Sequence, residues 1–121
     1  MLVKDIRKSD YARVIDGTTL CELLHPKNDD VELDFSIAHA VLKAGNSSLP
    51  HKLSGSIEIY FILEGKGEMH INMENNVVQA GQAIYIPSNA RQWIKNTEKD
   101  DLKFLCIVSP SWSEDNEELL P

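Results

Sequence analysis

The chain of 121 residues predicts an all-β fold, and three observations support this class. Short apolar runs recur along the chain, and residues that favour turns separate them. No segment sustains the apolar period of an α-helix over the roughly ten residues that a helix would need. A hydrophobic content of 42% at this length suits a single compact domain with a buried core. Strands are expected at residues 18–24, 33–43, 57–63, 68–73, 82–86, 91–96 and 102–108.

The breaks between these strands have chemical reasons. The glycines of segments 45–48 and 65–67 admit left-handed backbone angles. The pair Asn75 and Asn76 suits a tight hairpin, and Pro87 cannot donate a hydrogen bond to a central strand ladder. Each break therefore separates two strands.

The net charge and the cysteine content limit which binding partners and which cellular compartment are expected. The formal net charge of −7 would repel phosphate backbones and anionic membrane surfaces, so neither nucleic acid nor a membrane is an expected partner. Residues 1–11 alternate charged and apolar side chains and contain no apolar signal-peptide region, which favours a soluble, cytoplasmic protein. Cys21 and Cys106 lack CxxC spacing and favour reduced, buried thiols, with a single disulfide as the alternative.

The segment 57–63 has two different faces in an extended strand. Ile57, Ile59, Phe61 and Leu63 share one face, and Glu58, Tyr60 and Ile62 share the other. If Glu58 points inward, the apolar face lies outside and must be covered. A homodimer is the predicted cover, and the alternative is that the N-terminal residues 2–24 cover this face alone.

Two gapped strings carry a resemblance to a known family. They are Gly45-x5-His51-x-Leu53-x4-Glu58-x6-Gly65 and Gly81-x5-Pro87-x-Asn89-x2-Gln92-x3-Asn96, which resemble the two cupin motifs. The resemblance implies a jelly-roll, double-stranded β-helix barrel at residues 33–109. Residues 1–32 would then form N-terminal strands that cover the barrel, and residues 110–121 an acidic C-terminal tail.

The usual cupin pattern places three histidines and a glutamate on one metal, and this sequence keeps only part of it. His51 and Glu58 match, while Leu53 fills the second histidine position and Gln92 the third. The resemblance therefore implies a metal set of His51, Glu58 and Gln92 that holds Fe, Mn, Ni or Zn weakly, because an amide oxygen is a poorer donor than imidazole. Asn89 replaces a turn glycine, and asparagine tolerates left-handed angles well.

His39 is a further metal candidate whose orientation depends on the register of its strand. One register points Phe35, Ile37, His39 and Val41 into the barrel, and the opposite register points Ala38, Ala40 and Leu42 inward. Only the first would bring a second imidazole to the site.

Glu58 requires an explanation, because an ionised carboxylate in an apolar barrel costs several kcal/mol when unpaired. A metal ion, hydrogen bonds from Tyr60 or Gln92, an arginine such as Arg91, or protonation at a raised pKa would each account for it. In an extended strand Gln92 shares the inner face with Ile94 and Asn96, whereas Arg91 faces away.

Two classes of function follow. The preferred one is binding of a polar metabolite, such as a sugar or organic acid, by His51, Glu58, Tyr60 and Gln92, with Tyr85 or Trp93 at the mouth. The alternative is a metal-dependent isomerase, lyase or dioxygenase that uses His51, Glu58 and Gln92, with His51 or Glu58 moving a proton. A metal-free enzyme would need a His–Asp pair that the sequence does not reveal.

His25, His70 and the carboxylates of the C-terminal tail are not expected to take part in the site. His25 precedes Pro26 in a charged loop, and His70 lies on the polar face of its strand. The acidic tail is expected to be solubilising, with at most one helical turn, and to pack through Trp112 only. Its carboxylates are Glu114, Asp115, Glu117 and Glu118.

Overall fold

The computed structural model describes all 121 residues as eleven β-strands and two short 3-10 turns. The turns are η1 (Ile6–Lys8) and η2 (Glu114–Asn116). The strands are β1 (Ala12–Arg13), β2 (Thr19–Leu24), β3 (Ser36–Leu42), β4 (His51–Leu53), β5 (Ile57–Glu64), β6 (Lys66–Ile71), β7 (Glu74–Gln79), β8 (Ala83–Ile86), β9 (Gln92–Asn96), β10 (Leu102–Ser109) and β11 (Glu117–Leu119).

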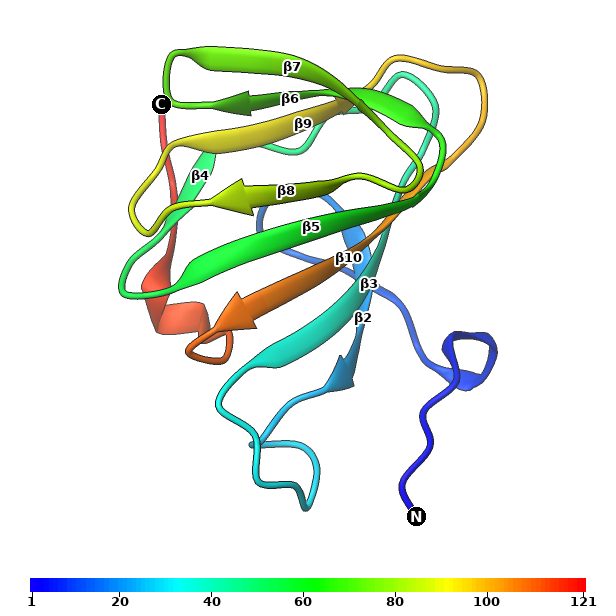
Figure 1. Cartoon of the computed structure of the whole chain (residues 1–121), viewed down its shortest axis with the longest axis vertical. Helices are drawn as coiled ribbons and strands as arrows, with labels where there is room; N and C mark the ends of the chain where they lie inside the picture. Colours follow the sequence, from blue (N-terminus) through cyan, green and yellow to red (C-terminus); the bar gives the residue numbers. More distant parts are fainter.

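The strands form two antiparallel sheets around one interior (Figure 1). The larger sheet has the order β1-β2-β3-β10-β5-β8, and the smaller has the order β11-β4-β9-β6-β7. Successive strands such as β4 and β5 belong to different sheets, so the chain winds from one sheet to the other. The predicted all-β jelly-roll barrel is confirmed.

Inward-facing residues of β3, β10 and β5 pair in rungs across the larger sheet. At one end of the barrel Leu42 pairs with Leu102, and the next rung joins Ala40, Phe104 and Ile62. These five side chains are at most 2% exposed and belong to a core of 13 buried residues. This end of the barrel is therefore packed solid, because apolar side chains from both sheets fill it.

The same strands become polar toward the other end of the barrel. The third rung is Ala38, Cys106 and Tyr60, and the fourth is Ser36, Val108 and Glu58. The period-two alternation predicted for residues 57–63 is thus confirmed, because Glu58, Tyr60 and Ile62 are all buried. A change from leucine and phenylalanine to serine and glutamate along neighbouring strands marks the polar end as the place for a site.

Asparagines with left-handed backbone angles form two of the turns. Asn89 has φ of 66°, so the prediction that asparagine replaces a left-handed glycine is confirmed. The hairpin expected at Asn75 and Asn76 is wrong: Ile71 pairs with Glu74, and the turn lies at Asn72 and Met73. Asn72 has φ of 53°, a left-handed angle that asparagine tolerates in a turn. Asn75 and Asn76 belong to strand β7.

The seven expected strands are present with slightly different ends, and four strands were missed. These four are β1, β4, β7 and β11. Cys21 and Cys106 are both buried and free, as the preferred prediction required. None of the helical segments has the length and apolar character that crossing a membrane would need.

Candidate functional site

A cavity of about 120 Å³ opens at the polar end of the barrel. Its walls come from the inner faces of β2, β3, β4, β5 and β10, from the loop before β2, and from the C-terminal segment. The lining residues are Val14, Asp16, Thr18, Leu20, Glu22, Ser36, Ala38, His51, Glu58, Tyr60, Cys106, Val108, Trp112 and Glu117.

Three of the four residues predicted from the sequence line this cavity, and the fourth lies directly beside them. His51, Glu58 and Tyr60 contribute to its wall. Gln92 is paired with His51 between β9 and β4, is 1% exposed, and accepts a hydrogen bond at Oε1 from the Tyr60 hydroxyl at 3.2 Å. The barrel thus brings the four side chains together.

The barrel disfavours ionisation of the Glu58 carboxyl. Burial raises its pKa to about 8, and the negative charge of Asp16 adds to this rise. A hydrogen bond from the Gln92 amide opposes the rise, and the charge of Glu117 adds a smaller increase. Glu58 is therefore a neutral acid around neutral pH, one of the explanations that the sequence left open.

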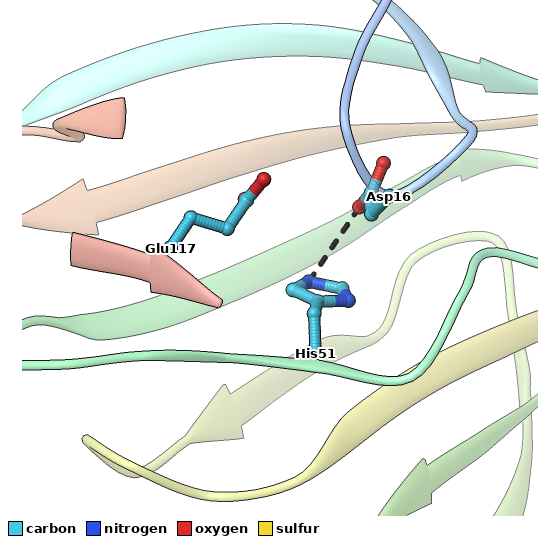
Figure 2. A group of neighbouring side chains, drawn as sticks. All are labelled: Asp16, His51 and Glu117. Atoms are coloured by element: carbon cyan, nitrogen blue, oxygen red, sulfur yellow. Dashed lines mark ion pairs between the residues drawn. The ribbon is translucent and has the colours of Figure 1, made fainter. Parts of the chain in front are cut away.

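His51 has a defined tautomer when it is neutral. Its Nδ1 lies 2.7 Å from the carbonyl oxygen of Leu49, which can only accept a hydrogen bond, so Nδ1 carries the proton. The lone pair is then on Nε2, on the side of the ring that faces Asp16. The distance from Nε2 to Asp16 Oδ2 is 3.5 Å (Figure 2). This is a His–Asp pair that sequence reasoning did not find.

Sequence reasoning also missed the acidic residues that the two ends of the chain bring into the cavity. Asp16 comes from the loop between β1 and β2, Glu22 from β2, and Glu117 from β11. The expectation that the acidic tail packs only through Trp112 is wrong, because β11 pairs with β4 and places Leu119 opposite His51. The only local signal was the Asp16-Gly17-Thr18 turn, which positions Asp16.

Several other candidates lie away from the cavity. His39 is on the outer face of β3, because the register places Ala38, Ala40 and Leu42 inside. Its Nδ1 lies 2.7 Å from the Tyr11 hydroxyl. The structure therefore does not bring the His39 imidazole to the cavity.

The residues expected at the mouth are also on the outside. Trp93 stacks on His70 with the ring centres 3.7 Å apart, and Tyr85 is 62% exposed. His25, expected in a solvated loop, is buried, and its Nε2 lies 2.7 Å from the carbonyl oxygen of Trp112.

One group of side chains meets the geometric requirement for a metal ion. Asp16, His51 and Glu117 each offer a donor atom, and these atoms lie within 4.8 Å of one another. Figure 2 shows the three side chains converging from the β1–β2 loop, β4 and β11. The family's own positions fit a metal less well, because Leu53 offers no donor atom and Gln92 Oε1 already accepts the bond from Tyr60.

A two-sheet jelly roll with a cavity at one end, in which polar side chains stand among apolar ones, is the architecture of a small barrel protein that can enclose a ligand. The chain belongs to the cupin family. The family model described as a cupin domain matches residues 38–108.

Relatives with known sequences are found in bacteria and archaea. An uncharacterized protein of Methanocaldococcus jannaschii is 37% identical over 125 residues, which cover 99% of each chain. An oxalate-binding protein of Thermotoga maritima is 37% identical over 71 residues, which cover 59% of each chain.

Solved structures support the same fold. A predicted oxalate decarboxylase of Thermotoga maritima has a TM-score of 0.80 and 27% identity, over 90% of this chain and 99% of the other. The nucleoside dehydratase Pac13 has a TM-score of 0.79 at 17% identity, over 99% of this chain and 91% of its own. At that identity the second likeness shows the fold alone.

Proposed function

We propose that this cupin binds a small polar metabolite, of the size of a short organic acid, in the cavity at the polar end of its barrel. His51, Glu58 and Tyr60 would contact the ligand, with Gln92 orienting Glu58 and Tyr60 from behind. The observation that carries the proposal is a cavity in which His51, Glu58 and Tyr60 stand among apolar side chains, in a barrel whose other end is packed solid.

The size of the cavity limits the ligand. A dry cavity of about 150 Å³ can hold one benzene molecule. The cavity here has about 120 Å³, so it suits a ligand slightly smaller than benzene. An acid of the size of oxalate would fit within it, whereas a whole sugar or nucleoside would have to protrude.

The charge of the cavity limits the ligand further. Asp16, Glu22 and Glu117 line it beside the neutral Glu58, with His51 as the only basic group. A bare dianion would meet like charges there. The ligand is therefore either an uncharged polar molecule or a carboxylate whose charge a bound cation balances. The relative described as an oxalate-binding protein supports the carboxylate.

Thermal unfolding with a panel of ligands tests this function. We expect oxalate or another short organic acid, added with Mn²⁺, to raise the melting temperature by about 10 °C at a hundredfold excess over Kd. His51→Gln should abolish the rise. If no short acid or polyol stabilises the wild type, with or without a metal ion, the proposed function is wrong.

The alternative function is a metal-dependent enzyme, favoured by the three converging donor atoms beside the cavity. In this alternative His51, Glu58 and Gln92 take the catalytic roles implied by the family. The protein would then convert the metabolite chemically, whereas in the preferred function it only binds it. Incubation with oxalate and Mn²⁺ separates the two: formate released faster than by His51→Ala would favour the enzyme. We expect binding without release of formate.

A homodimer is the second part of the proposal. On the outer face of the larger sheet Tyr85, Ile59 and Ile107 are cross-strand neighbours, as are Phe61 and Leu105. Tyr11 covers the β3 side of this face at His39, but Phe61 and Leu63 remain 37% and 39% exposed. N-terminal cover is thus partial, and a second copy would bury the rest. A mass of two chains in light scattering would support the dimer, and a monomer at micromolar concentration would refute it.

The same proposal includes a cytoplasmic location, with neither nucleic acid nor a membrane as a partner. Two free thiols support a reducing, cytoplasmic location. The formal net charge of −7 supports the expectation that the chain binds neither nucleic acid nor a membrane.

A further inference from the structure

We infer that Asp16, His51 and Glu117 form a divalent-cation site that fastens both ends of the chain over the cavity. The inference rests on the proposed function, because the cation would also balance the charge of a carboxylate ligand. It differs from the family's usual arrangement in two ways. Only His51 is shared, and the carboxylates come from outside the barrel motifs.

Each of the three side chains has one atom fixed by the protein and another left free. His51 is bound through Nδ1 to the Leu49 carbonyl, and no hydrogen bond uses its Nε2. Asp16 Oδ1 accepts from the Thr18 amide at 3.0 Å and from the Thr18 hydroxyl at 2.6 Å, which leaves Oδ2 toward His51. Partners of this kind orient metal ligands in proteins.

Glu117 gives the observation that points to a ligand. Its Oε1 accepts a hydrogen bond from Trp112 Nε1 at 3.3 Å. Its Oε2 is buried and has no hydrogen-bond partner. A buried carboxylate oxygen without a partner is costly, and the contact between His51 Nε2 and Asp16 Oδ2 does not reach it. A cation between the three side chains would satisfy this oxygen as well as Nε2 and Oδ2.

The distances suit a first-row transition metal. Two ligands about 2.1 Å from a tetrahedral ion lie about 3.4 Å apart. The distance from His51 Nε2 to Asp16 Oδ2 is 3.5 Å, close to this value. The widest separation in the group, within 4.8 Å, requires a small closing movement of a side chain. One imidazole with two carboxylates favours Mn²⁺, Fe²⁺ or Zn²⁺ over softer ions.

The site would couple cation binding to the C-terminal strand. β11 is an edge strand that pairs with β4 at three positions only. Up to Trp112 the segment is held by His25, and beyond β11 the Leu120 amide donates to the Pro50 carbonyl at 2.9 Å. A short edge strand near a terminus frays readily. A cation that binds Glu117 together with His51 would suppress this opening.

Isothermal titration with Mn²⁺ alone tests the site, followed by Zn²⁺. We expect one ion per chain, and binding at least about tenfold weaker in Asp16→Asn and in Glu117→Gln. Glu118→Gln is the matched control: it removes the same charge from the neighbouring residue of β11, whose side chain instead pairs with Lys52 at 3.4 Å. Circular dichroism in EDTA confirms that each variant folds, and deletion of residues 117–121 gives a second variant without the ligand.

Hydrogen exchange gives a readout that does not depend on any activity. Mn²⁺ should slow exchange in residues 117–121 of the wild type and of Glu118→Gln, but not of Glu117→Gln. The inference is overturned if no ion binds, if Glu117→Gln binds as tightly as the wild type, or if the tail exchanges equally fast with and without Mn²⁺. Because no organic ligand is present, such a failure is separate from a failure of metabolite binding, which the thermal panel measures.

Discussion

The buried carboxyl of Glu58 should make the stability of this protein fall with pH in a predictable way. Its pKa rises from 4.5 to about 8 on folding, mainly because of burial. Between these values the unfolded chain gives up the proton while the folded chain keeps it. The free energy of unfolding therefore falls as pH rises through this window and becomes constant above it. Glu58→Gln removes the titrating group.

The size of the effect follows from the shift. Each pKa unit corresponds to about 1.4 kcal/mol, so the full window corresponds to at most about 5 kcal/mol. Between about pH 5 and pH 8 the wild type should lose about 3 to 4 kcal/mol relative to Glu58→Gln. This is a large part of the stability of a domain of this size.

Urea unfolding of the wild type and the variant at several pH values, in EDTA to exclude metal ions, measures the difference. Glu64→Gln is the matched control, because Glu64 lies on the same strand but is exposed and pairs with Lys103. Its curve should run parallel to the wild type. Parallel curves for Glu58→Gln as well would refute the argument, because they would mean that Glu58 titrates alike in both states.

Three further changes test other parts of the structure. Phe104→Ala removes a fully buried ring from the packed end and should cost about 3 to 5 kcal/mol in urea unfolding, so a cost below about 1 kcal/mol would contradict the packing. Asn89→Gly should leave stability nearly unchanged while Asn89→Ala costs about 1 kcal/mol, because of the left-handed φ of 66°; equal stability of the two would count against that backbone. Phe61→Lys should convert the proposed dimer into a monomer in light scattering, and an unchanged mass would place any interface elsewhere.

The barrel motifs could be read from the sequence because their residues repeat with the geometry of strands. Alternation at β5 correctly put Glu58 and Tyr60 on one face, and the cupin resemblance, not the alternation, indicated that this face points inward. The orientation of His39 could not be settled in the same way. Both faces of β3 are largely apolar in sequence, and alternation alone does not say which one is inside.

The residues from the two ends of the chain could not be predicted, for a different reason. Glu117 stands in a run of acidic residues whose composition is that of a solvated tail. Only the pairing of β11 with β4, a contact between residues far apart in the chain, turns it toward His51. Asp16 likewise reaches the cavity because its carbonyl accepts a hydrogen bond from the Leu49 amide, which fastens its loop beside His51.

The most direct test of the site is a crystal structure of the protein soaked in Mn²⁺, with anomalous difference maps to locate the ion. The structure predicts one peak between Asp16, His51 and Glu117, about 2.1 to 2.2 Å from a donor atom of each. A peak next to Glu58 and Gln92 instead, or no peak at His51 at millimolar Mn²⁺, would contradict the proposal that Asp16 and Glu117 complete the metal site.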